Sequence, residues 1–99
     1  MTNILLVCQG GMSSSFLVKK IHEAFTKNQE EIQIISKASM EIVDYIDWAD
    51  IILVSPSVLY AMDEIMEVCQ EYGIIPILIP LELYGRMDGD AIRKLIVNS

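Results

Sequence analysis

The sequence has few of the residues that several common classes of protein depend on. Its 99 residues include two cysteines, one histidine, three prolines and five glycines. Two cysteines far apart in the chain, Cys8 and Cys69, are too few for a disulfide-stapled extracellular fold. The lone histidine has no Cys, Asp or Glu cluster around it at metal-ligand spacing. We therefore expect no metal ion and no cofactor, and two unpaired thiols in a reducing compartment.

Long apolar runs and targeting signals are also missing. No run approaches the roughly 20 apolar residues that span a bilayer, and no charged segment with a cleavage site precedes the first apolar run. The few glycines and prolines form no linker, and no segment repeats. These absences predict one domain over residues 1–99 and a cytoplasmic protein.

Positive charge is scarce. Lys and Arg total seven, Asp and Glu total 14, and the formal net charge is −7. A surface of this kind repels phosphate backbones and anionic lipid, so we do not expect a nucleic-acid partner. It suits a partner protein that carries basic patches.

What the sequence does contain is a regular alternation of strand and helix patterns. Nearly continuous runs of Ile, Leu and Val, typical of parallel strands covered on both faces, lie at 4–8, 32–36, 51–55 and 74–79. Apolar residues recur at helical spacing in 15–28, 39–48 and 57–72 and in a last segment that starts near 88–89. Ser57 and Asp88 are the expected N-caps of the last two segments, and Gly73 is an expected helix stop.

This alternation predicts an α/β protein with right-handed crossovers. The expected architecture is a flavodoxin-like three-layer fold, in which a four-stranded parallel sheet of order 2-1-3-4 is flanked by helices. Ligands in such folds bind at the carboxyl ends of the strands, where the chain order reverses. Two loops meet there, one that begins at Cys8 and one that covers 55–57.

The first of these loops, "VCQGGMSSSF" (7–16), has the composition of a phosphate cradle. The glycine pair lets consecutive N–H groups turn toward an anion, and the serines add hydroxyl donors at the positive end of the following helix. The same field favours the thiolate form of Cys8, which makes this residue a candidate nucleophile for a phosphoryl group. The expected phosphate-binding residues are Gln9, Gly10, Gly11, Met12, Ser13, Ser14 and Ser15.

Other ligand sites and enzyme classes found on this fold match the sequence less well. A nucleotide loop needs Lys followed by Ser or Thr, and a dinucleotide fingerprint needs G-x-G-x-x-G; neither is present. Flavin binding stays open but gives Cys8 no role. The main alternative is an enzyme like the low-molecular-weight tyrosine phosphatases and arsenate reductases, whose cysteine loop closes with an arginine six positions on. That position is Ser14 here, so the bidentate clamp for a hydrolytic transition state is missing, which favours a carrier. A buried, inert Cys8 in a non-catalytic binding module is the third possibility.

Three segments together resemble a known family. They are "CQGGMSSSFLVKKI" (8–21), "SPSVLYAMDEI" (55–65) and "LYGRMDGDAI" (83–92). The chain is similar over nearly its whole length to the cytosolic B component of the lactose/cellobiose class of the phosphoenolpyruvate-dependent sugar phosphotransferase system.

The resemblance implies a phosphotransferase that is phosphorylated on Cys8. The donor would be a phosphohistidine of the A component, and the acceptor a β-glucoside-type sugar, such as cellobiose, lactose or chitobiose, imported by the membrane-embedded C component. Residues near the same end of the sheet are candidates for a rim that contacts these partners: Ser55, Pro56, Ser57, Tyr84 and Arg86. The last two are expected in the loop after the fourth strand.

Overall fold

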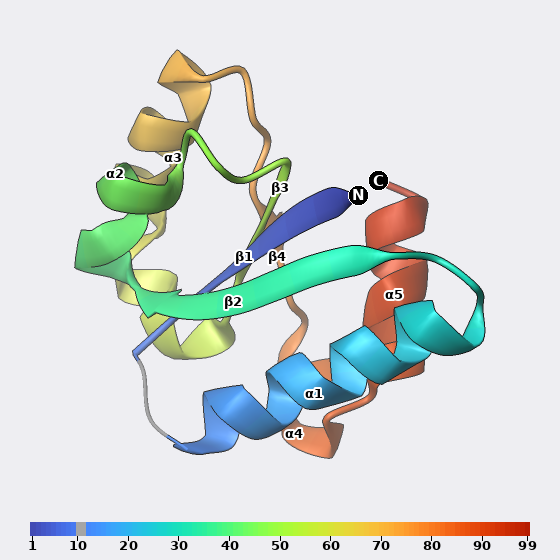
Figure 1. Cartoon of the computed structure of the whole chain (residues 1–99). Coiled ribbons are helices and arrows are strands. Elements are labelled where there is room, and N and C mark those ends of the chain that lie inside the picture. Colours follow the sequence, from blue (N-terminus) through green and yellow to red (C-terminus); the bar gives the residue numbers. More distant parts are fainter. Residues whose placement is uncertain (10–11) are drawn as a thin grey trace.

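One parallel sheet with helices on both faces makes up the computed structural model, which describes residues 1–9 and 12–99 but not the side chains of residues 12–14 (Figure 1). The strands are β1 (Thr2–Cys8), β2 (Ile32–Ala38), β3 (Ile51–Val54) and β4 (Ile77–Leu78). Their order in the sheet is β2-β1-β3-β4, and every pair is parallel. The predicted fold class and strand order are confirmed.

The helices form two layers around this sheet. Figure 1 shows α1 (Met12–Lys27) and α5 (Gly89–Val97) on one face, and α2 (Ile42–Tyr45) and α3 (Met62–Glu71) on the other. A short helix, α4 (Leu81–Arg86), lies beside α1. Two 3-10 turns complete the chain, η1 (Ser39–Glu41) before α2 and η2 (Pro56–Ala61) before α3.

The central strand β1 divides the core into two halves. Successive side chains of a strand point to opposite faces of the sheet. Accordingly Leu5 and Val7 belong to the core under α2 and α3, while Ile4 and Leu6 belong to the core under α1 and α5. All four are fully buried, which explains why the run "ILLV" shows no polar alternation. By the same period, Cys8 faces the α1 side.

The segment predicted as a helix over 57–72 begins differently. Ser57 is not its cap; instead the buried Ser55 hydroxyl accepts a hydrogen bond of 3.2 Å from the backbone N–H of Ser57. Val58 has a non-helical backbone (φ −115°), so the chain turns through η2 before regular α-helix begins at Met62. The helix stop is confirmed, because Gly73 adopts φ +69°.

The region after the fourth strand also differs from the expectation. Tyr84 and Arg86 lie in helix α4 rather than in a loop. The six-residue helix is held by packing, since Leu83 and Tyr84 contact the core under α1 and α5. It ends at Met87, whose φ of 51° is left-handed. The next residue caps α5 as predicted: the Asp88 carboxylate accepts a 3.1 Å hydrogen bond from the N–H of Ala91.

Candidate functional site

Cys8 occupies the last position of β1, at the carboxyl edge of the sheet where the strand order reverses. Its neighbour on one side is Ala38, the last residue of β2. On the other side β3 leads into Ser55, whose N–H donates a 2.9 Å hydrogen bond to the carbonyl of Val7. The Cys8 side chain is 1% exposed, whereas Gln9 directly after it is exposed. Cys8 therefore sits at the position where this fold binds ligands, but with its sulfur covered.

The helix that follows Cys8 offers an uncompensated positive end. At 16 residues α1 is long enough for a full dipole, and its first turn contains no acidic residue. The first turns of α3 and α5, in contrast, carry acids that offset their own dipoles. An anion at the start of α1 would therefore meet backbone N–H donors without a competing carboxylate.

The residues predicted to bind phosphate lie partly at the start of α1 and partly outside the described residues. Met12, Ser13 and Ser14 form the first turn of α1, and Ser15 is exposed on the same helix. The predictions for Gly10 and Gly11 lie outside the described residues. Phe16, one position further along, is 52% exposed, with the Lys20 ammonium 5.6 Å from its ring centroid. An exposed aromatic ring in the first half of α1 is available to a partner protein.

The second loop at this edge is fixed by its own hydrogen bonds. The Ser55 and Ser57 hydroxyls lie 2.8 Å apart, and Ser55 also holds the N–H of Ser57. Pro56 and Ser57 are half-buried. Because the Ser55 hydroxyl is already engaged, its evident function is to shape the turn beside Cys8.

Unlike the loop at Ser55–Ser57, Tyr84 and Arg86 do not lie beside Cys8. Tyr84 is half-buried against the core, and Arg86 lines a groove with Lys20 and Lys27 along the second half of α1. Lys20 is eight residues beyond Met12, or about 12 Å along the helix. The Arg86 guanidinium lies 3.7 Å from the carboxylate of Asp88. No guanidinium is thus placed at Cys8 among the described side chains.

The second cysteine lies in a different part of the fold from Cys8. Cys69 is fully buried in the last turn of α3, within the core under α2 and α3. This burial raises the pKa of its thiol, because desolvation disfavours the thiolate. The interpretation of Cys69 as a core residue is confirmed.

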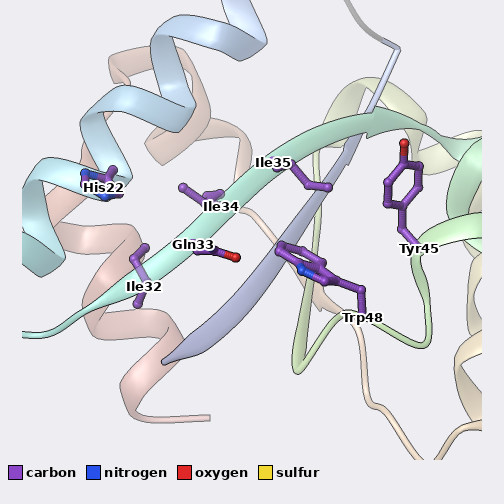
Figure 2. A pocket seen from close by; sticks show the side chains of 7 residues that line it. All are labelled: His22, Ile32, Gln33, Ile34, Ile35, Tyr45 and Trp48. Carbon is purple, nitrogen blue, oxygen red and sulfur yellow. The ribbon is translucent and has the colours of Figure 1, made fainter.

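A separate groove follows the outer edge of the sheet (Figure 2). Residues of β2 line its floor, and Trp48 and Tyr45 stand at one side while His22 of α1 stands at the other. The β2 residues involved are Ile32 to Ile35, which pair with Thr2 to Leu5 of β1. The groove thus lies toward the amino ends of the strands, away from Cys8. His22 is exposed, as expected for a surface helix residue.

Comparison with known proteins decides the family. The family model for the lactose/cellobiose-specific IIB subunit of the phosphotransferase system (PTS) matches residues 3–95. The chain belongs to this IIB family. It is accordingly a sugar-specific component of the PTS and a phosphotransferase.

Relatives of this IIB chain align with it over most of their length. The galactose-specific EIIB component of Lactococcus lactis subsp. cremoris is 29% identical over 96% of this chain and 93% of the relative. The oligo-beta-mannoside-specific EIIB component of Bacillus subtilis is 32% identical over 90% of this chain and 86% of the relative.

Solved structures agree with the fold. The lactose-specific IIB domain of Streptococcus pneumoniae superimposes with a TM-score of 0.86 at 18% identity, over 98% of this chain and 95% of that one. The cellobiose-specific IIB protein of Borrelia burgdorferi gives a TM-score of 0.81 at 30% identity, over 98% and 89% of the two chains. Within residues 1–9 and 12–99 of this IIB chain, no helix combines the length and apolar character needed to cross a bilayer.

Proposed function

We propose that this IIB chain is a phosphocysteine carrier and that Cys8 is the residue that becomes phosphorylated. The observation that carries the proposal is the position of Cys8, at the carboxyl end of the central strand and on the face of the sheet covered by α1. A helix whose first turn lacks acids follows it. The phosphoryl oxygens are stabilised by the backbone N–H groups of such a helix end.

The reaction consists of two phosphoryl transfers. In the first, the Cys8 thiolate attacks the phosphorus of a phosphohistidine on the A component; the P–N bond breaks as the S–P bond forms. In the second, a sugar hydroxyl attacks the same phosphorus, loses its proton, and the sulfur leaves as thiolate. A cysteine thiolate is a competent leaving group, so the intermediate remains ready for transfer.

The absence of a cation separates a carrier from a hydrolase. The position six residues after Cys8 is Ser14, and the nearest arginine in the sequence is Arg86. Neutral N–H and hydroxyl donors bind phosphate without the fixed charge that stabilises a hydrolytic transition state. We therefore expect the phosphocysteine to persist in water until the acceptor sugar arrives.

The burial of Cys8 adds a requirement. A sulfur that is 1% exposed cannot be attacked in line by a partner's phosphohistidine. Loading must accompany a local rearrangement at the carboxyl end of β1 that exposes the sulfur. We expect binding of the A component to drive this rearrangement, which keeps the unloaded thiol away from other electrophiles.

The partners that follow are the A component as donor, the membrane-embedded C component and its sugar. This places the chain at the cytoplasmic face of the membrane. The curated relatives are named for galactose, cellobiose and oligo-beta-mannoside at similar identities. One of these sugars, cellobiose, is of the expected β-glucoside type, and the C component would make the choice among sugars.

The test is a phosphoenolpyruvate-driven relay with a purified A component, followed by intact-mass measurement. Wild type and Cys69→Ala should each gain the mass of one phosphoryl group, and Cys8→Ala should gain none. Circular dichroism of Cys8→Ala should match wild type, which separates loss of the acceptor from loss of the fold. Phosphorylation retained in Cys8→Ala and lost in Cys69→Ala would refute the assignment. Turnover of p-nitrophenyl phosphate by the isolated chain would instead favour a phosphatase.

A further inference from the structure

A groove of about 630 Å³ runs along α3 and the segment that leads from it into β4. Its lining includes Met66, Glu67 and Asp63 from the helix and Ile75 from the segment. Met66 is 51% exposed and Ile75 is 86% exposed. Apolar side chains this exposed, gathered in one groove, are typical of a surface that binds another protein.

Residues 39–76, the segment that contains this groove, account for the net negative charge of the chain. Lys37, just before this segment, contacts α2, with its ammonium 4.9 Å from the ring centroid of Tyr45. Residues 39–76 include eight of the 14 acidic residues and none of the seven cations: Glu41, Asp44, Asp47, Asp50, Asp63, Glu64, Glu67 and Glu71. The rest of the chain holds six acids and all seven cations, which nearly cancel. In the described part of the chain, the ion pairs are Lys27–Asp90, Arg86–Asp88 and Arg93–Glu30, and none involves this segment.

The groove also lies at the opposite edge of the sheet from Cys8, the proposed acceptor. Strand β4 begins at Ile77, so the lining residues Gly73 to Pro76 precede it at the amino ends of the strands. Cys8 is at the carboxyl ends. In Figure 1 the last turn of α3 is at the top of the molecule, and the end of β1 is at the lower left. A segment bound in this groove would leave the Cys8 edge open.

We propose that this groove binds a basic, partly apolar cytoplasmic segment of the membrane-embedded C component. The inference rests on the proposed function, since it assigns a surface to one of its partners. Cytoplasmic loops of membrane proteins are enriched in Lys and Arg, which complements the acids of residues 39–76. An anionic bilayer surface is repelled by the same charges. A docking site remote from Cys8 lets the C component hold the chain while the Cys8 edge receives the next phosphoryl group.

The experiment measures binding to the C component reconstituted in phosphatidylcholine proteoliposomes, using the C component that supports sugar phosphorylation with this chain. Two groove variants, Glu67→Lys and Ile75→Ser, change exposed residues and should fold normally. Each should weaken binding about tenfold, which corresponds to roughly 1.4 kcal/mol. The KM for this chain in sugar phosphorylation should rise to match, with kcat and the loading of Cys8 by the A component unchanged.

Glu23→Lys is the matched control, because it reverses the same charge on the exposed face of α1 and should change binding less than about twofold. Repeating the binding measurement in a Cys8→Ala background separates the two proposals, since docking should persist there even if Cys8 is not the acceptor. The proposal is overturned by unchanged binding of both groove variants, or by equal binding to liposomes without the C component. It is also overturned if the groove variants lose loading from the A component or change self-association of the chain.

Discussion

At the scale of single residues, two cysteines of the same sequence have opposite environments. Cys69 is enclosed by the core under α2 and α3, and Cys8 ends a strand at the carboxyl edge of the sheet. Both are almost fully buried, so burial by itself does not separate them. What separates them is position, because the start of a helix is an electropositive place and the middle of an apolar helix face is not.

The environment of Cys69 predicts a pH dependence of stability. Burial raises the pKa of its thiol, so in alkaline solution the unfolded chain releases this proton before the folded one does. The stabilisation from the protonated Cys69 thiol is therefore fully present below the ordinary thiol pKa and is lost as the pH rises through that value toward the raised pKa of the folded state. Urea titrations should show this loss of unfolding free energy in wild type, and a smaller one in Cys69→Ala.

The burial of the Cys69 thiol can also be tested by alkylation. In the native state, Cys69 should react with iodoacetamide only as fast as the chain unfolds. An identical pH dependence of stability in the two proteins, together with rapid native alkylation of Cys69, would contradict this account.

At the scale of elements, the contact between α5 and α1 depends on a missing side chain. A Cβ atom placed on Gly89 would lie 2.3 Å from the backbone carbonyl oxygen of Lys20 in α1. The two helices approach this closely because position 89 is glycine, and backbone atoms cannot yield as a side chain could.

Substitution at this contact gives a sharp test. Gly89→Ala should force α5 away from α1 and lower the unfolding free energy by about 1–3 kcal/mol. Gly85→Ala is the control, because nothing lies within 4 Å of its Cβ position and it stands inside helix α4. Alanine there should raise stability by about 0.5–1 kcal/mol. Urea unfolding followed by the fluorescence of Trp48 measures both; equal effects would show that the Gly89 contact does not determine the packing.

Elements with strong periodicity could be predicted from the sequence, and those held by tertiary packing could not. The runs of Ile, Leu and Val predicted the four strands, and right-handed crossovers predicted a parallel sheet. The fourth run was expected to form a strand over 74–79, but β4 contains only Ile77–Leu78, and the residues before it lead from α3 into the sheet. Helix α4 was missed: six residues that follow Pro80 and include Gly85 show no helical pattern, and contacts of Leu83 and Tyr84 with the core hold it.

The site was predictable to a similar degree. Its position followed from the alternation of strands and helices, together with the composition of the loop after Cys8. The cap at Ser55 was assigned to Ser57 because a serine before a helical run looks the same whether regular helix or a 3-10 turn follows. The burial of Cys8 was one possibility raised by its place at the end of an apolar run, but the sequence could not decide between a buried and an exposed thiol.

At the scale of the whole molecule, charge is divided unevenly along the chain. Residues 39–76, which include α2 and α3, hold eight acids and no cation, while the rest of the chain is nearly neutral. Lys37 of β2 is the cation that contacts α2, through the ring of Tyr45. Like charges within one segment repel each other and lower the stability of the folded state.

This division predicts that added salt stabilises the protein. Raising NaCl from about 10 mM to about 300 mM shortens the screening length and weakens the repulsion. The unfolding free energy should rise by a few tenths of a kcal/mol, and the double variant Asp44→Asn/Asp47→Asn should show a smaller rise. Glu23→Gln, in the nearly neutral part of the chain, should respond to salt as wild type does. A decrease in stability with salt would mean that the ion pairs outweigh the repulsion.

The central place of β1 has a consequence for synthesis on the ribosome. Of the four strands this one is synthesised first, yet it needs β2 on one side and β3 on the other, and the second partner is complete only at residue 54. Until then a nascent chain carries an apolar strand with one bare edge, the form most prone to wrong pairing. Every copy therefore passes through an interval in which the strand that ends at Cys8 is also the segment most in need of a chaperone.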